Sequence, residues 1–239
     1  MRGNIEVILV DIGNTQIKSA EVVNGAILEI TYWESIEELS NAYSKDTHYM
    51  LSSTRSGRLT LPNAIHLDHL TPIPITHQYQ TIETLGTDRI ASLVGAYELF
   101  PDQNSLVIDL GTCMTMDLIT QEGVFMGGII SPGLQMRMKA MSQYTTSLPD
   151  ISEEWHQYDN DLLGTTTKEC LYSGSYNAII NEIQGTIQRL EADFTSINVI
   201  ISGGDAQHFE SRVKAHIFAG SKIVLLGLYR IWRELMNAG

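Results

Sequence analysis

The feature that most constrains this chain is a hairpin pattern that occurs twice. Val7–Thr15 reads Val-Ile-Leu-Val-Asp-Ile-Gly-Asn-Thr, and Leu106–Thr112 reads Leu-Val-Ile-Asp-Leu-Gly-Thr. In each copy a short apolar run predicts a buried strand, which ends at Asp11 or Asp109. The glycine that follows lets the backbone approach a ligand closely. Two copies about one domain apart predict a duplicated architecture whose halves face each other across a phosphate site.

The residues of these turns indicate phosphate together with a cation. Successive backbone N–H groups in such a turn form a concavity that suits phosphate. A carboxylate would repel bare phosphate, so Asp11 is better explained as a residue that holds a cation or its waters. One copy alone is also typical of an ordinary hairpin with a turn-capping aspartate. The second copy in a matched context favours the phosphate site.

Length and charge narrow the class of protein. With 239 residues and 43% hydrophobic content, the chain can form two domains, and the turn cluster Pro101–Asn104 predicts a boundary that gives domains 1–104 and 105–239. The formal net charge of −13 disfavours a nucleic-acid or anionic-membrane partner. The two cysteines are too few for a disulfide framework. No signal peptide or membrane-spanning run is recognisable, so a cytoplasmic location is expected.

The predicted elements alternate between strands and helices. Strands are expected at about residues 6–11, 17–22, 26–30, 49–53, 115–119, 124–130 and 199–202. Ser35 and Glu38 form a capping-box pattern, which predicts a helix to about Tyr43. Thr71–Gln80 contains two prolines and is expected to be an extended linker.

Four further helices are expected. They begin near Asp88, near Gly133, after residue 169 and near Lys222. The third has an apolar stripe from Ile179 to Phe194, which could serve either the core or a dimer interface.

Two common nucleotide-binding motifs do not occur. The sequence has no Gly-x-x-x-x-Gly-Lys-Ser/Thr run, and no Gly-x-Gly-x-x-Gly follows a predicted strand. This disfavours P-loop, Rossmann and protein-kinase architectures. The two Asp-x-Gly hairpins, with Gly203-Gly204 at the end of a third apolar strand, resemble the superfamily of acetate and sugar kinases, Hsp70 and actin.

Within that superfamily the chain resembles the type III pantothenate kinases over nearly its whole length. The matching segments are Asp11-Ile12-Gly13-Asn14-Thr15, Gly86-Thr87-Asp88-Arg89, Asp109-Leu110-Gly111-Thr112 with Thr115 and Asp117, Gly127–Gly133, Leu148-Pro149, Gly203-Gly204 and Leu226-Gly227-Leu228. The resemblance implies an α/β fold of two similar actin-like (ribonuclease H-like) domains. Each domain would be a mixed β-sheet flanked by helices, with the active site in the cleft between them.

The resemblance also implies a reaction. ATP would phosphorylate the primary hydroxyl of pantothenate to 4'-phosphopantothenate, the first step of coenzyme A biosynthesis. By family match, the catalytic residue is Asp88, which would orient the hydroxyl and accept its proton. The residues implied in ATP binding are Asp11, Ile12, Gly13, Asn14, Thr15, Gln16, Ile17, Lys18 and Thr112. Those implied in substrate binding are Tyr79, Gly86, Thr87, Asp88, Arg89 and Thr167.

Cations and a second subunit belong to the same family pattern. Asp11 would hold Mg²⁺ through water, and Asp109 would bind a monovalent cation, K⁺ or NH₄⁺. Arg89 would offer a planar cation to the pantothenate carboxylate or to a transferring phosphoryl oxygen. The family is dimeric, so a homodimer is expected.

The chain departs from the family pattern at two places. Thr166 stands where the family usually has Asn, and Ile82-Glu83-Thr84 lies where it often has a proline. Two other functions stay open at this point. One is a different small-molecule kinase, which would have no reason to contain Gly-x-Asp-Arg. The other is a non-enzymatic regulator, which the retained Asp88 and Asp109 disfavour.

Overall fold

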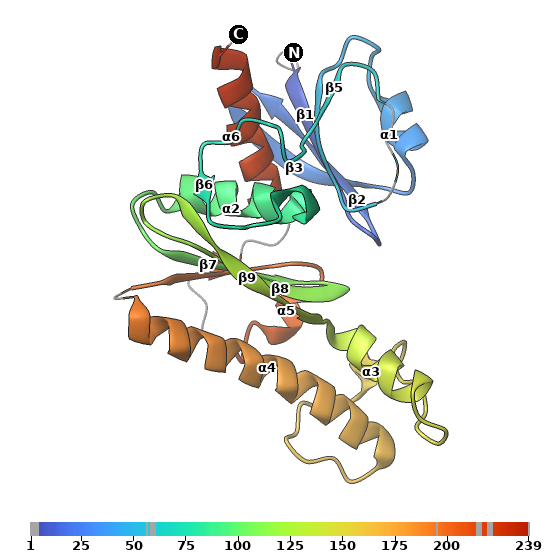
Figure 1. The fold of residues 1–239 in the computed structure, drawn as a ribbon. Helices are drawn as coiled ribbons and strands as arrows, with labels where there is room; N and C mark the ends of the chain where they lie inside the picture. Colours follow the sequence, from blue (N-terminus) through green and yellow to red (C-terminus); the bar gives the residue numbers. More distant parts are fainter. Residues whose placement is uncertain are drawn as a thin grey trace. The chain divides into compact units, whose positions relative to one another are not determined.

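A computed structural model describes residues 5–55, 57, 61–194, 196–213, 217–218 and 222–238 (Figure 1). The chain forms two compact units. The first comprises Met1–Gln103, Asp117–Gly127 and Ser221–Gly239, and the second comprises Asn104–Met116 and Gly128–Gly220.

Among the described residues, the first sheet has five strands in the order β3-β2-β1-β4-β5. These strands are β1 (Ile5–Ile12), β2 (Ile17–Val23), β3 (Ala26–Trp33), β4 (Tyr49–Ser53) and β5 (Ala64–His66). β1, β2 and β3 pair antiparallel, whereas β4 pairs parallel to β1 and β5 parallel to β4. The sheet is therefore mixed, as predicted.

The second sheet repeats this order. Its described strands lie in the order β11-β10-β7-β8-β9-β6. They are β6 (Thr76–His77), β7 (Ser105–Leu110), β8 (Cys113–Ile119), β9 (Val124–Pro132), β10 (Asn198–Ser202) and β11 (Ile217–Phe218). Apart from the added edge strand β6, the series β9-β8-β7-β10-β11 corresponds to β3-β2-β1-β4-β5. The predicted duplication is confirmed at the level of sheet topology.

Local sequence explains the boundaries of the first elements. Asn24 and Gly25 have φ of 50° and 76°, the left-handed conformation that the predicted tight hairpin requires. Ser35 accepts a hydrogen bond from the Glu38 N–H and starts α1 (Ile36–Ala42). Thr71–Gln80 is not simply a linker, because Thr76–His77 pairs with Val124–Phe125.

Two helices of the first unit pack unusually closely. They are α2 (Thr87–Leu99) and α6 (Lys222–Ala238). A Cβ added to Gly227 would lie 1.7 Å from the Ala91 carbonyl oxygen, and one added to Gly95 would lie 2.2 Å from that of Ile223. Only glycine permits this approach, so the last helix belongs to the first unit. The division therefore differs from the predicted 1–104 and 105–239 in its assignment of residues 117–127 and 221–239.

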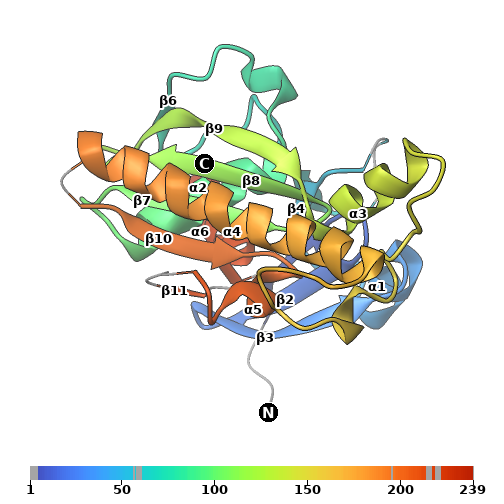
Figure 2. The same cartoon turned by 90° about the horizontal axis from the view of Figure 1, so that it is seen from below.

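The second unit is built around α4 (Thr167–Asp193), which runs along one face of the sheet formed by β7 and β10 (Figures 1 and 2). Ile179, Ile180 and Ile183 are buried, whereas Ile187 and Leu190 are half-buried. The first part of the apolar stripe thus serves the core. The shorter helical elements are α3 (Leu134–Gln143), α5 (Ala206–Phe209) and η2 (Trp155–Gln157), with η1 (Ile82–Thr84) in the first unit.

Candidate functional site

The first Asp-x-Gly turn lies at the carboxyl end of β1. Asp11 and Ile12 are buried and belong to the strand, whereas Asn14, Thr15 and Gln16 are exposed. The Gly13 N–H donates to the Gln16 carbonyl at 3.0 Å, which closes the turn. Ile17 is buried, and half-buried Lys18 lies opposite Asp11 in the register of β1 and β2. A lysine and an aspartate thus flank exposed backbone.

The loop after β4 holds this turn from one side. The Thr54 N–H and hydroxyl donate to the Ile12 carbonyl at 3.1 and 3.3 Å. The exposed Arg55 donates from Nε to the Gly13 carbonyl at 2.9 Å and from Nη2 to the Asn14 carbonyl at 3.4 Å. Three successive carbonyls of the phosphate motif are therefore fixed by two neighbouring residues.

The Gly-x-Asp-Arg segment begins α2 and is attached to the end of β4. The Thr87 hydroxyl lies 3.0 Å from the Ser52 hydroxyl and accepts from the Ser53 N–H at 3.0 Å. Ser52 pairs in register with Asp11. Thr87 therefore anchors the helix start beside the first phosphate motif, and this contact engages the hydroxyl predicted to bind substrate.

Asp88 lies in the first turn of α2, two residues after the N-cap residue Gly86. Its Oδ1 accepts the Arg89 N–H at 2.9 Å. Burial raises the pKa of the Asp88 carboxyl above its ordinary value, while the Arg89 N–H and charge oppose that rise. A carboxylate in such surroundings is a better proton acceptor than one in water.

Arg89 is buried and forms a two-pronged ion pair. Its Nε donates to Asp117 Oδ2 at 2.8 Å and its Nη2 to Oδ1 at 2.5 Å. Its guanidinium also lies 5.9 Å from the centre of the Tyr79 ring, which stacks on Phe125 at 5.4 Å. Burial opposes the charge of Arg89, but Asp117 more than offsets this effect and raises the pKa of the arginine. The structure thus brings Tyr79 to the Gly-x-Asp-Arg segment.

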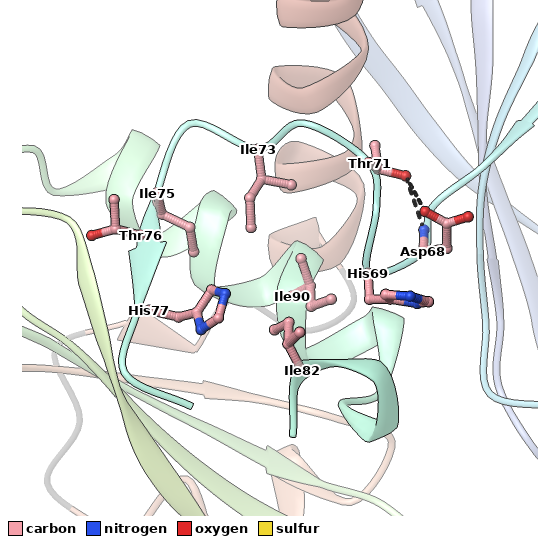
Figure 3. Close-up of a pocket in the computed structure, with 9 residues that line it drawn as sticks. All are labelled: Asp68, His69, Thr71, Ile73, Ile75, Thr76, His77, Ile82 and Ile90. Carbon is pink, nitrogen blue, oxygen red and sulfur yellow. Dashed lines mark hydrogen bonds between the residues drawn. The ribbon is translucent and has the colours of Figure 1, made fainter. Parts of the chain in front are cut away.

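A pocket of about 360 Å³ lies behind this segment, in the first unit (Figure 3). Ile73, Ile75, Ile82 and Ile90 give it an apolar lining, and His77 points into it. The pocket is lined by none of the predicted site residues. It borders the site through Ile90, the residue after Arg89, and through His77, whose Nδ1 lies 3.1 Å from the Tyr79 carbonyl oxygen.

In the second unit, the Asp109 turn is held by backbone and glycine. The Gly133 N–H donates to the Thr112 carbonyl at 3.1 Å, and a Cβ on Gly133 would lie 2.0 Å from the Gly111 carbonyl oxygen. The half-buried Asp109 pairs in register with Ser202 of β10. The segment that ends at Gly133 therefore packs directly on the second phosphate motif.

The Gly203-Gly204 pair closes on the same turn. Gly203 has φ of 99°, and a Cβ there would lie 2.2 Å from the Leu110 carbonyl oxygen. The Asp205 N–H donates to that carbonyl at 3.0 Å. A Cβ on Gly204 would have no atom within 4 Å, so this backbone is open to a flat ligand.

The departure at Thr166 has a structural explanation. Thr166 is the N-cap of α4: its hydroxyl accepts the Glu169 N–H at 3.3 Å, and Glu169 accepts the Thr166 N–H at 3.1 Å. Threonine and asparagine both cap helices well. Thr167, the predicted substrate contact, is exposed as the first residue of the helix.

Two residues of this site were not predicted as site residues. Arg55 and Asp117 each act on a predicted segment through a contact between residues distant in the chain. Asp117 was noted only as part of the second phosphate motif. An acid six residues after a turn glycine, or an arginine in a loop, is too common to indicate such a role.

No group of three or more His, Cys, Asp or Glu in the described part of the chain could hold a metal. Within that same part, no helix has the length and apolar character needed to cross a membrane.

Comparison of the fold with solved structures gives proteins of similar fold. The chain aligns with a protein described as a Baf family transcriptional activator from Campylobacter jejuni, with a TM-score of 0.64, 22% identity, and coverage of 97% of this chain and 100% of the other. It also aligns with the activator of 2-hydroxyisocaproyl-CoA dehydratase from Clostridium difficile with bound ADPNP, at a TM-score of 0.56, 14% identity, and 97% and 96% coverage. These likenesses support the predicted α/β fold.

Sequence comparison is more specific. A family model described as type III pantothenate kinase matches residues 61–189. A type III pantothenate kinase of Cytophaga hutchinsonii is 38% identical over 94% of this chain and 97% of its own length. A type III pantothenate kinase of Christiangramia forsetii is 36% identical over 92% of this chain and 95% of its own length. Together with the ordered motifs and their placement in the two units, these matches show that the chain belongs to the type III pantothenate kinase family.

Proposed function

We propose that this chain catalyses the reaction of its family, ATP-dependent phosphorylation of pantothenate in coenzyme A biosynthesis, with Asp88 as the proton acceptor. The observation that supports the role of Asp88 is its position beside the buried Arg89–Asp117 pair, with Tyr79 against the same guanidinium. A carboxylate, a cation and an aromatic face together suit a small polar substrate that carries both a hydroxyl and a carboxylate.

Each protein group has a defined task in this proposal. Asp88 orients the primary hydroxyl of pantothenate and accepts its proton as the oxygen attacks the γ-phosphorus. The bond from that phosphorus to the β,γ-bridging oxygen breaks, and ADP leaves. Phosphoryl transfer needs little covalent help from the protein and depends on positioning and charge neutralisation. Arg89 places a fixed positive charge next to Asp88 and attracts the pantothenate carboxylate or steadies a phosphoryl oxygen.

The phosphate motifs bind the nucleotide. The backbone N–H groups of Asn14 and Thr15, with Lys18, bind phosphate oxygens, and Thr112 contributes from the second motif. The proposed full set is Asp11, Ile12, Gly13, Asn14, Thr15, Gln16, Ile17, Lys18 and Thr112. Gly204 leaves open backbone for the nucleoside.

Two cations are part of the proposal. A single carboxylate at a strand end suits Mg²⁺, which in kinases is held by one or two carboxylates, water and the substrate phosphates. Asp11, next to exposed turn backbone, is the proposed Mg²⁺ residue. Asp109 is the proposed residue for K⁺ or NH₄⁺, and its carboxylate and the surrounding carbonyls are the hard oxygen donors that such cations prefer.

The decisive experiment measures ATP-dependent phosphorylation of pantothenate in potassium and in sodium. It compares the wild type with Asp88→Asn and, as a matched control, Asp46→Asn, an exposed aspartate of the first unit. General-base catalysis contributes about 10²–10⁴-fold, so kcat of Asp88→Asn should fall by that factor. Asp46→Asn should match the wild type.

The outcomes separate the parts of the proposal. Turnover that survives in Asp88→Asn would place the proton acceptor elsewhere. Equal rates in potassium and sodium would remove the monovalent cation from Asp109. Absence of turnover with pantothenate in either salt would refute the activity, and other small hydroxylated acceptors would then be tested.

We also propose that the chain forms a homodimer and acts in the cytoplasm, where ATP is available. Support for the dimer comes from apolar side chains of the second unit that are left partly open, at Ile187, Leu190 and Phe194 in and after α4. Analytical ultracentrifugation tests this: a monomer mass at assay concentrations would contradict it, and Leu190→Glu should weaken a dimer that uses this stripe.

A further inference from the structure

The geometry points to Arg55 as a positioning residue for nucleotide phosphate: it fixes the first phosphate turn through the carbonyls of Gly13 and Asn14. Arg55 belongs to no motif of the family described above and is exposed. The inference rests on the proposed use of residues 13–15 for phosphate. It adds a residue to that site and explains why the turn presents N–H donors, and not carbonyl oxygens, to phosphate.

Peptide geometry is the first step. In a planar trans peptide the C=O and the N–H point in opposite directions. No cis peptide occurs among the described residues. Arg55 donates to the Gly13 and Asn14 carbonyls at 2.9 and 3.4 Å, so both carbonyls point toward the guanidinium. The N–H groups of the same two peptides, those of Asn14 and Thr15, therefore point away from it.

Two successive N–H groups that point the same way form an anion-binding nest. Without Arg55, the peptides that follow Gly13 and Asn14 can rotate, and either carbonyl can then face an incoming phosphate. A carbonyl oxygen repels phosphate. The guanidinium selects the orientation that presents donors, and its positive charge behind the turn adds to the attraction.

The loop after β10 in the second unit corresponds to the loop that contains Arg55, but it has no arginine at this place. Register pairs Asp11 with Ser52 and Asp109 with Ser202, so the segments after these serines correspond. Thr54 donates its N–H to the Ile12 carbonyl, and Asp205 donates its N–H to the equivalent Leu110 carbonyl. In the loop after β4, the residue that follows Thr54 is Arg55, whose guanidinium binds two carbonyls. The loop after β10 has Gly203, Gly204 and Asp205 in the corresponding place.

The planar fork of arginine matters as well as its charge. Nε and Nη2 of one guanidinium can reach two neighbouring carbonyls at once, and a lysine ammonium keeps the charge but has no fixed pair of donors. Arg55→Lys therefore separates the orientation of the turn from simple charge attraction.

The test is titration of the protein with a non-hydrolysable ATP analogue and Mg²⁺, together with steady-state kinetics. We expect Arg55→Ala to raise Kd and the KM for ATP about tenfold, and Arg55→Lys to raise them about fivefold. The KM for pantothenate should stay within twofold, and thermal melts should match the wild type because Arg55 is exposed. Lys45→Ala, which removes another exposed positive charge from the same unit, should bind the analogue as the wild type does.

Each other outcome overturns the inference. Unchanged analogue binding in Arg55→Ala would show that the guanidinium does not prepare the turn. Wild-type affinity in Arg55→Lys, or an equal loss in Lys45→Ala, would show that only charge matters. Analogue binding is measured without pantothenate, so it tests Arg55 independently of the proposed activity. If the wild type binds the analogue but does not phosphorylate pantothenate, the proposed activity is refuted, and the comparison of the Arg55 variants still holds.

Discussion

The two Asp-x-Gly turns share a sequence pattern and a place in their sheets, yet they are held by different means. In the first unit, side chains hold the motifs: Arg55 holds the Gly13 turn, and Asp117 holds Arg89. In the second unit, the Asp109 turn is held by backbone hydrogen bonds and by the close approach of Gly133 and Gly203. A duplicated motif can thus keep its geometry while the supporting contacts diverge.

The difference has a functional side. Charged side chains can be adjusted by substitution, pH and salt, whereas a backbone contact has one allowed geometry. The first unit, which contains the proposed proton acceptor Asp88, should therefore respond to changes in the charge of its side chains. The second unit should respond sharply to added atoms.

The largest effect is expected from Asp117→Asn. The change removes the charge that compensates buried Arg89, and breaking such a pair costs about 3–5 kcal/mol. Chemical denaturation at neutral pH measures the free energy of unfolding, with Asp46→Asn as the control. The double variant Arg89→Met with Asp117→Leu should recover most of that stability but not pantothenate turnover. A loss below about 1 kcal/mol in Asp117→Asn would show that the pair is not the main support of this region.

Gly133→Ala should have the next largest effect. Its φ of −71° suits alanine, so any loss comes from the added Cβ, which would lie 2.0 Å from the Gly111 carbonyl oxygen. Overpacking costs about 1–3 kcal/mol, and the shifted turn should weaken ATP binding. Gly174→Ala in α4 is the control, because a Cβ there meets no atom within 4 Å. Equal behaviour of the two variants would contradict the contact-based account of the second turn.

Thr166→Ala should lower stability by about 1 kcal/mol, because it removes the N-cap of α4. Thr166→Asn, which restores the usual family residue, should stay within about 0.5 kcal/mol of the wild type. Both variants are compared with the wild type by thermal unfolding and by the KM for pantothenate. A large change in KM for Thr166→Asn with unchanged stability would mean that this position contacts substrate and is not only a cap.

The smallest effect concerns pH and the first unit. The raised pKa of Asp88 means that folding favours its protonated form. The stability from this group is full below the unfolded pKa of about 3.9 and is lost as the pH rises through the folded pKa. Asp88→Asn is neutral at every pH, so its Tm should exceed that of the wild type at pH 7 and approach it near pH 4. A lower Tm at pH 7 would show that Asp88 is stabilised in its charged form.

Much of the fold was predictable because local signals agree with the tertiary structure. The strand that ends at Asp11, the Asn24-Gly25 turn and the Ser35 cap each follow from neighbouring residues. The duplication was predictable because both Asp-x-Gly turns occur in the same context. The motifs also predict which segments contribute to the candidate site.

The missed features depend on long-range contacts. Gly95 looks like an ordinary helix glycine in the sequence and Gly227 only matches a family segment; the packing of α2 on α6 explains why both are glycine. Arg55 and Asp117 lie outside the residues predicted for the site because their partners are far away in the chain. The short strand Thr76–His77 forms only because Val124–Phe125 offers an edge.

The place of α6 in the first unit also affects the order in which the protein can fold during synthesis. Domains generally fold as units, with N-terminal ones first. Here the first sheet emerges early, but the face of α2 that receives Gly227 stays uncovered until Lys222–Ala238 has been made. The segments of the second unit are all synthesised before that helix. The unit that begins first should therefore be the last to be completed on the ribosome.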